Sequence, residues 1–207
     1  MWISHGIILW LSIFSAPPNC LQYHLGPSGQ IQSFNYDIGP NLNSQSVIDP
    51  LNSQFGIGYL NSMDYTICFR KENGFCSQTY FIPNINITQQ QANQDTTSRG
   101  TFNINNVNEQ GRPSVGDNEA GTGIGRCPHD YLLISGLRLC GYHLNSNSFQ
   151  TSRNFDAPVT DNSSGPFIAR FVSNDVINGR GFRISFQQNP CGAQPSSSVP
   201  MVPFGRR

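Results

Sequence analysis

Cysteine and histidine occur close together in two short motifs, Cys127-x-His129 and Cys140-x-x-His143. Two thiolates and two imidazoles are a common ligand set for a structural zinc ion. In an exported chain, however, the cysteines oxidise to disulfides and no longer bind a metal. We therefore predict no zinc site, with His129 and His143 as free surface side chains.

The sequence offers little material for catalysis. It contains four histidines and twelve Asp and Glu residues, and it has no Gly-x-Ser-x-Gly motif. If all six cysteines form disulfides, no thiol remains to act as a nucleophile. The acidic residues form no recognisable catalytic pair. We predict that the protein is not an enzyme and has no catalytic residue.

The composition indicates one all-β domain. A chain of 207 residues is long enough for a domain of ordinary size with tails. Only 12% of the residues are charged and the formal net charge is +0, so charge provides no basis for binding nucleic acid or an anionic membrane. Fourteen Phe and seven Tyr among many Asn, Ser and Gly residues are typical of short strands and polar turns.

The N-terminus indicates export. A short apolar run over residues 6–14 ends at Ser15-Ala16, as in a secretory signal peptide spanning residues 1–16. This run is too short to span a bilayer comfortably, and no later segment is apolar enough to do so. Six cysteines, an even number, suit an exported protein. We predict a secreted, extracellular protein without a membrane span; alternatively, residues 1–16 are a misjoined start of a longer extracellular protein.

Alternating apolar and polar residues predict several strands. Residues 65–70 and 76–82 flank Asn73-Gly74, which favours a type I′ turn, so we predict a hairpin. In that register Cys68 and Cys76 lie on opposite faces and do not pair. Further strands are predicted on both sides of Ser135-Gly136 and over residues 181–188. The predicted core consists of Ile31, Ile67, Phe69, Tyr131, Leu133, Phe171, Phe182, Ile184 and Phe186.

Residues 89–124 differ in composition from the rest of the chain. They are mostly Gln, Asn, Gly, Thr and Ser, which cannot form a packed core. We predict a long flexible loop insertion, in which residues 101–105 could add one short edge strand. The tail, residues 192–207, is rich in Pro and Ser and is predicted to be disordered.

The stretch from Cys127 to Gly141 carries the most specific motif. Asp130-Tyr131-Leu132-x-Ile134-x-Gly136 follows Cys127 and precedes Cys140-Gly141. This pattern resembles the signature of the CUB module, an extracellular β-sandwich. The opening segment, Cys20-Leu-Gln-Tyr23 and then Ser33-Phe-Asn35, is closest to the CUB-like proteins of insects and other arthropods, although Phe34 stands where the CUB pattern usually has proline. The resemblance covers roughly residues 20–191 and implies an antiparallel, jelly-roll-type β-sandwich.

The resemblance also implies a disulfide pairing. Six cysteines by themselves allow fifteen pairings. The two bridges of the CUB pattern correspond here to Cys20–Cys68 and Cys127–Cys140. This leaves Cys76–Cys191 as the third bridge.

Many CUB modules bind calcium through three acidic residues, so the resemblance raises the question of a calcium site. Asp130 matches the second ligand, and Asp175, or Asn174 one residue earlier, matches the third. The first ligand, a glutamate, has no counterpart, because residues 85–89 at that place contain no acid. A hard cation needs several charged oxygens to offset its dehydration. We therefore predict no metal and no cofactor, with Asp130 capping a corner.

The resemblance implies an extracellular, non-enzymatic module that binds a protein or glycan partner through its loops. Two alternatives are the CUB portion of a larger secreted protease or hydrolase, and a structural matrix component. Two glycosylation sequons, Asn86-Ile-Thr88 and Asn162-Ser-Ser164, lie in predicted loops. In an exported chain Asn86 and Asn162 are therefore the candidate glycosylation sites, and the sequence leaves open whether they are used.

Overall fold

The structure, a computed structural model, describes residues 16–36, 58–82, 101–107, 112–116, 119–145, 156–176 and 178–192. The regular elements in these ranges are all β-strands, as predicted. The described residues contain no helix that is long and apolar enough to cross a membrane. The strands are β1 (Cys20–His24), β2 (Ser28–Gln32), β3 (Asp64–Phe69), β4 (Phe75–Phe81), β5 (Phe102–Asn103), β6 (Ala120–Thr122), β7 (Tyr131–Ile134), β8 (Leu137–Gly141), β9 (Val159–Asp161), β10 (Phe167–Val172) and β11 (Gly181–Pro190).

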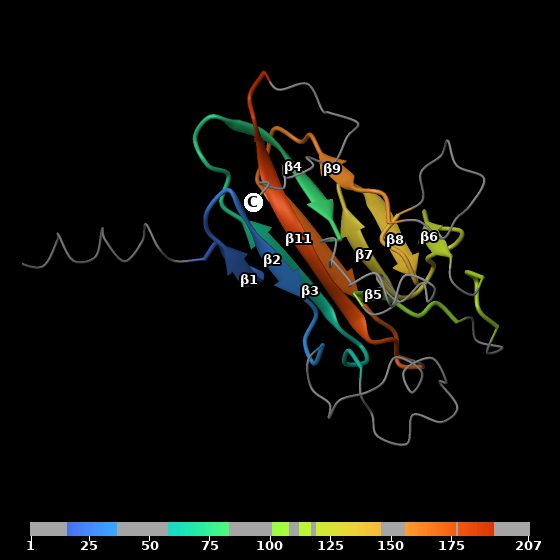
Figure 1. Cartoon of the computed structure of the whole chain (residues 1–207). Helices are drawn as coiled ribbons and strands as arrows, with labels where there is room; N and C mark the ends of the chain where they lie inside the picture. Colours follow the sequence, from blue (N-terminus) through green and yellow to red (C-terminus); the bar gives the residue numbers. More distant parts are fainter. Residues whose placement is uncertain are drawn as a thin grey trace, which may run out of the picture.

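The strands form a sandwich of two sheets (Figure 1). The six-stranded sheet has the order β1-β3-β10-β7-β8-β6. The five-stranded sheet has the order β2-β11-β4-β9, and β5 pairs with β11 beside that path. The pairs within the sheets are antiparallel except for β1 and β3, which are parallel. This is the predicted β-sandwich.

Aromatic side chains from both sheets fill the space between them. In β11, Phe182, Ile184 and Phe186 are buried and the residues between them are not, as the alternating pattern predicts. The Phe186 ring lies 4.7 Å from Phe69 of the other sheet, and Phe182 lies 5.6 Å from Phe171. These tilted and edge-on ring contacts are favourable aromatic geometries, so they join the two sheets along β11.

The hairpin around Ser135-Gly136 has the predicted turn but the opposite facing. Ser135 has φ 49° and Gly136 has φ 79°, the two positive values that a type I′ turn requires. Leu132 and Ile134 are fully buried, whereas Tyr131 and Leu133, which we predicted in the core, are half-buried. Tyr131 still packs against the margin of the core, but Leu133 lies on the outer side. Four consecutive apolar residues carry no alternation, so their facing is decided by pairing with β10.

The hairpin predicted around Asn73-Gly74 is wrong, because β3 and β4 belong to different sheets. Of the two turn residues only Gly74 has a positive φ, 85°. The linking segment instead crosses between the sheets: the Glu72 carboxylate accepts the N–H of Gly26 at 2.8 Å, and the Glu72 N–H donates to the Gln188 side chain at 2.9 Å. Cys68 and Cys76 are therefore kept apart by the sandwich and not by hairpin register.

The prediction that residues 89–124 form a flexible loop without structure is wrong for the part that the structure describes. Residues 101–107, 112–116 and 119–124 pack on the sandwich and supply β5 and β6. The short strand allowed for residues 101–105 exists as β5, where Phe102 pairs with Phe182. Phe102 and Ile104 are fully buried. A few well-placed apolar residues thus attach a polar segment to a core that other strands build.

Three disulfides join the strands, and they are the three pairs discussed above. Cys20–Cys68 connects β1 to β3, Cys127–Cys140 connects the start of the β7–β8 hairpin to β8, and Cys76–Cys191 connects β4 to the end of β11. Gly121 of β6 lies directly on one of them. A Cβ atom there would stand 2.5 Å from the Cys140 sulfur, so only glycine fits.

Two sequence predictions concern segments that lie almost entirely outside the described residues. Of the predicted signal peptide, residues 1–16, only Ala16 lies in the described ranges. Of the predicted tail, residues 192–207, only Gly192 does.

Candidate functional site

Asp130 lies at the end of the sandwich where several loops meet. Its side chain is 1% exposed. One carboxylate oxygen accepts the Tyr59 hydroxyl at 2.5 Å, and the other accepts the N–H of Asn174 at 2.7 Å. The amide of Asn106 donates to the Asp130 backbone carbonyl. One buried corner thus joins three loop segments that are distant in the sequence, and we call it the Asp130 corner.

Burial controls the protonation of this corner. It raises the pKa of Asp130, and the hydrogen bonds from Tyr59 and Asn174 only partly oppose this effect. Burial and the neighbouring Asp130 carboxylate also raise the pKa of Tyr59 well above its ordinary value. The Tyr59 hydroxyl therefore stays protonated and donates a hydrogen bond to the Asp130 carboxylate.

In the part of the chain that the structure describes, the corner offers a cation only one carboxylate, that of Asp130. Calcium takes six to eight oxygen ligands, usually with several carboxylates. Both Asp130 oxygens already accept hydrogen bonds from the protein. Asp175 is exposed at the surface, where its backbone carbonyl accepts the Asn61 amide. Among the described residues, no three His, Cys, Asp or Glu side chains are grouped so as to hold a metal.

The loops around the Asp130 corner are tied to one another by further hydrogen bonds. The Ser62 N–H donates to the Asn174 carbonyl at 2.7 Å, and the Asn61 amide donates to the Asp175 carbonyl at 3.2 Å. The Ser173 hydroxyl donates to the Leu60 carbonyl at 2.8 Å. The segments 58–62 and 173–176 are therefore held as one unit.

Two apolar side chains are exposed on this unit. Leu60 is 46% exposed and Val176 is 50% exposed. With Asn61 and Asp175 they form a surface that we call the loop tip. Sequence reasoning missed it, because a single Leu or Val in a polar stretch gives no periodic signal. The available signal was only that Val176 follows Asp175, the residue that matches a ligand position of the CUB pattern.

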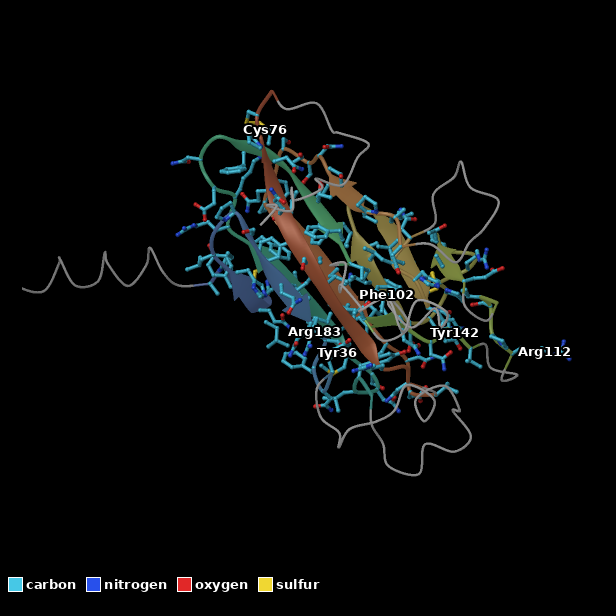
Figure 2. The ribbon with its side chains drawn as sticks, viewed as in Figure 1. Tyr36, Cys76, Phe102, Arg112, Tyr142 and Arg183 are labelled. Carbon is cyan, nitrogen blue, oxygen red and sulfur yellow. A yellow bond between two sulfur atoms is a disulfide. The ribbon has the colours of Figure 1, made fainter. Side chains whose placement is uncertain are left out.

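Tyr36 and two arginines lie at the same end of the sandwich. The Arg180 and Arg183 guanidinium groups stand 4.8 Å and 4.6 Å from the centre of the Tyr36 ring. Figure 2 shows Tyr36 and Arg183 at the opposite end of β11 from Cys76. Cation–π contacts of this kind hold both arginine side chains against the Tyr36 ring.

The residues of the hypothetical zinc site have other roles. Cys127 and Cys140 are joined in a disulfide, so neither is a thiolate. His143 is buried, and its Nδ1 lies 3.1 Å from the Asp156 carboxylate, so the prediction of a free surface side chain is wrong for it. Asp156 also accepts the N–H of Leu144, which ties this segment down. His129 is partly exposed.

The two sequons differ in what the structure describes. Asn162 is exposed in the loop between β9 and β10. The following N–H, of Ser163, donates to the Asp161 carboxylate at 2.9 Å and shapes this loop. Asn86 lies outside the described residues.

Comparison with known families decides what kind of domain this is. The family model "Animal CUB domain" matches residues 17–189. The chain belongs to the animal CUB domain family. CUB domains are generally modules without enzymatic activity, and together with disulfide bonds they point to extracellular proteins.

Two solved structures are similar in fold to this CUB domain. One is the full extracellular region of zebrafish Gpr126/Adgrg6, with 16% identity, a TM-score of 0.42, and coverage of 83% of this chain and 15% of that one. The other is the CUB1-EGF-CUB2 region of human MASP-1/3, with 17% identity, a TM-score of 0.43, and coverage of 82% and 42%. This chain thus spans less than half of either structure. A search of curated proteins finds no match.

Proposed function

We propose that this CUB domain is a secreted, non-enzymatic binding module that contacts an extracellular protein or glycan through the loops around the Asp130 corner. The observation that supports this proposal most directly is the loop tip. It presents two exposed apolar side chains, Leu60 and Val176, on loops that are tied together by hydrogen bonds.

The rigidity of the loop tip favours binding. A surface whose loops are already ordered loses less conformational entropy when a partner docks. The Asp130 corner supplies this order through Tyr59, Asn106 and Asn174. The apolar side chains favour a protein partner, since burying apolar area is the main driving force of such contacts.

The proposal does not involve calcium. The loops are positioned by a buried carboxylate that accepts two hydrogen bonds from the protein. A partner would contact side chains and backbone groups of the loop tip, with no ion-ordered carboxylate cluster between them. The proposal also includes removal of residues 1–16 on secretion and glycosylation of Asn86 and Asn162. A relationship to arthropod CUB-like proteins belongs to it as well, on the wording of residues 20–35.

The test is a comparative capture experiment. The purified mature chain and a Leu60→Asp, Val176→Asp variant are immobilised and exposed to extracellular fluid of the source organism. Bound proteins are identified by mass spectrometry. We expect at least one protein that the wild type retains and the variant loses by tenfold or more, because two charges would be placed in the contact.

A matched control separates this surface from general stickiness. Ile124 is the most exposed large apolar side chain among the described residues, at 71%, and lies away from the loop tip in the turn after β6. Ile124→Asp should leave the captured protein unchanged. Capture that Ile124→Asp and the loop-tip variant affect equally would exclude the loop tip as the binding site.

A further inference from the structure

The outer face of the six-stranded sheet is a second candidate surface, separate from the loop tip. Strand alternation decides which side chains it presents. From β10 these are Ile168, Arg170 and Val172, because Phe167, Ala169 and Phe171 point into the core. Neighbouring strands add Tyr131 and Leu133. We call this surface the Arg170 face.

The Arg170 face combines exposed apolar side chains with charged ones. Ile168 is 41% exposed, and Leu133 pairs directly with Arg170 in the neighbouring strand. At the edge of the same sheet Leu21 is 59% exposed. The outer face of the other sheet is built mostly from Gln, Ser, Thr and Asn side chains of β2, β4 and β11. Clustered apolar side chains outside a core mark a site of contact.

An ion pair stands in the middle of this apolar surface. The Arg170 guanidinium binds the Asp64 carboxylate through two parallel hydrogen bonds, one of them Nε to Oδ1 at 2.6 Å. Both side chains are about half exposed, 48% for Arg170 and 53% for Asp64. Hydrogen bonding and the charge of Arg170 lower the pKa of Asp64, so the pair stays charged near neutral pH.

Two shallow grooves flank this pair. One, of about 270 Å³, is lined by Leu133, Ser135 and Ile168. The other, of about 510 Å³, is lined by Leu21, Cys20 and Asp64. Thr66 and Arg170 line both grooves, so they form the ridge between them.

We propose that the Arg170 face binds a second copy of this chain. A two-fold interface uses the same surface twice, so the surface must be complementary to itself. The Asp64–Arg170 pair in the centre of the face meets this condition, whereas a centre of one sign would repel its copy. Arg138 of β8, which pairs with Leu133 and lies over the Tyr131 ring, adds a further positive charge nearer the β8 side of the face. A two-fold axis between Asp64 and Arg170 brings the arginine of each copy to the aspartate of the other.

The grooves match this arrangement. β1 and β7 lie on opposite sides of β3 and β10 in the sheet. With the axis nearly along the strands, Leu21 of each copy comes over the Leu133–Ile168 groove of the other. Sheets that pack face to face keep their strands within about 30° of each other, so this orientation is ordinary. A net charge of +0 adds no long-range repulsion between copies.

Sedimentation velocity of the secreted mature chain tests the proposal. N-glycans are removed first, because Ser163 beside the Asn162 sequon lines the smaller groove. We expect a monomer–dimer equilibrium with a Kd on the order of 10–100 μM, as for a small and transient interface. Higher salt should weaken it, since the exchanged ion pairs are screened. A chain that remains monomeric at about 1 mM would overturn the proposal.

Charge-reversal variants identify the face. Asp64→Lys places two positive charges at the centre of each face and Arg170→Asp places two negative charges there, so each variant alone should dimerise at least tenfold more weakly. An equimolar mixture of the two should restore dimerisation, because opposite faces then meet. Both residues are exposed, and unchanged thermal melts will check that the variants fold. Failure of the mixture to recover would overturn the proposal.

The control substitution lies on the other outer face. Gln187 is exposed in β11 on the five-stranded sheet. Gln187→Lys makes the net charge more positive, as Asp64→Lys does. It should nevertheless leave the dimer unchanged. Equal weakening by both variants would assign the effect to net charge and contradict a specific Arg170 face. None of these measurements involves the loop tip, so the result is independent of the proposed binding role. A glycan on Asn162 would lie beside the smaller groove, so the same measurement before glycan removal shows whether the glycosylated chain still dimerises.

Discussion

The two ends of the sandwich are held together in different ways. At one end, the Asp130 corner joins loops through hydrogen bonds to a single buried carboxylate. At the other end, the Cys76–Cys191 disulfide closes β4 onto β11. At this end, the buried Gln78 amide and the Tyr80 hydroxyl are neighbours, and neither has a well-formed hydrogen bond to another group among the described residues.

The comparison shows where buried polar groups are matched and where they are tolerated. At the Asp130 corner the carboxylate oxygens have donors, so the network specifies one loop arrangement. At the disulfide end a covalent bond maintains the strand ends, and the protein can carry an unsatisfied amide there. We therefore expect the first end to respond to loss of a polar group and the second to loss of the bridge.

The largest expected effect is removal of the bridge at the disulfide end. Replacing both Cys76 and Cys191 by alanine frees a loop of 115 residues in the unfolded chain. Loop entropy predicts a loss of about 5 kcal/mol in the free energy of unfolding. Replacing Cys127 and Cys140, 13 residues apart, should cost only about 3 kcal/mol. Urea unfolding of both variants measures the difference, and an equal loss would contradict the loop argument.

The next effect is at the Asp130 corner. Asp130→Ala leaves the Tyr59 hydroxyl and the Asn174 N–H buried without an acceptor, which should cost about 3 kcal/mol. Asp130→Asn keeps one acceptor and should cost less. Chemical unfolding of the two variants checks this order. Two variants of equal stability would mean that the carboxylate does not organise the corner.

Two buried glutamines at the disulfide end provide a smaller and sharper comparison. Gln78 and Gln188 face each other across β4 and β11. Gln188 bonds the Arg70 carbonyl and the Glu72 N–H, whereas the Gln78 amide has the Tyr80 hydroxyl beside it but forms no well-aligned hydrogen bond among the described residues. Gln188→Leu should therefore destabilise the protein by about 2 kcal/mol, and Gln78→Leu should stabilise it by about 1 kcal/mol. Thermal unfolding measures both signs; a destabilised Gln78→Leu variant would reveal a partner for this amide.

The pH dependence of stability should reveal the buried carboxylate. The pKa of Asp130 is raised above its ordinary value of 3.8, so the folded protein holds this proton more tightly than the unfolded chain. Stability should fall as the pH rises from 3.8 to the raised pKa and should change no further above it. Asp130→Asn should remove this slope. Unfolding curves at a series of pH values compare the two, and identical slopes would contradict the raised pKa.

The smallest expected effect is that of calcium, which should be zero. The Asp130 carboxylate already accepts hydrogen bonds from the protein, and the described residues group no further carboxylates with it as calcium would need. Thermal melts with millimolar calcium and with chelator should coincide. A rise in melting temperature that Asp130→Ala abolishes would identify a calcium ligand.

The sequence determined those features that local pattern specifies. The motif from Cys127 to Gly141 and the alternation of Phe182, Ile184 and Phe186 predict the CUB sandwich and its closing strand. Ser135-Gly136 forms the turn expected there. These features are local: one turn needs two positive φ values, and one strand needs every second residue apolar.

Only the tertiary structure decided features that depend on distant partners. The facing of residues 131–134 follows from pairing with β10, and β3 and β4 go to different sheets because each finds its neighbours elsewhere in the chain. Phe102 and Ile104 become core residues through contacts with β11 and Gly141. The motif singles out Asp130 in the sequence. It does not reveal that this carboxylate accepts hydrogen bonds from Tyr59 and Asn174, because these residues lie 71 and 44 positions away. Hydrogen bonds and packing across such separations leave no trace in local periodicity.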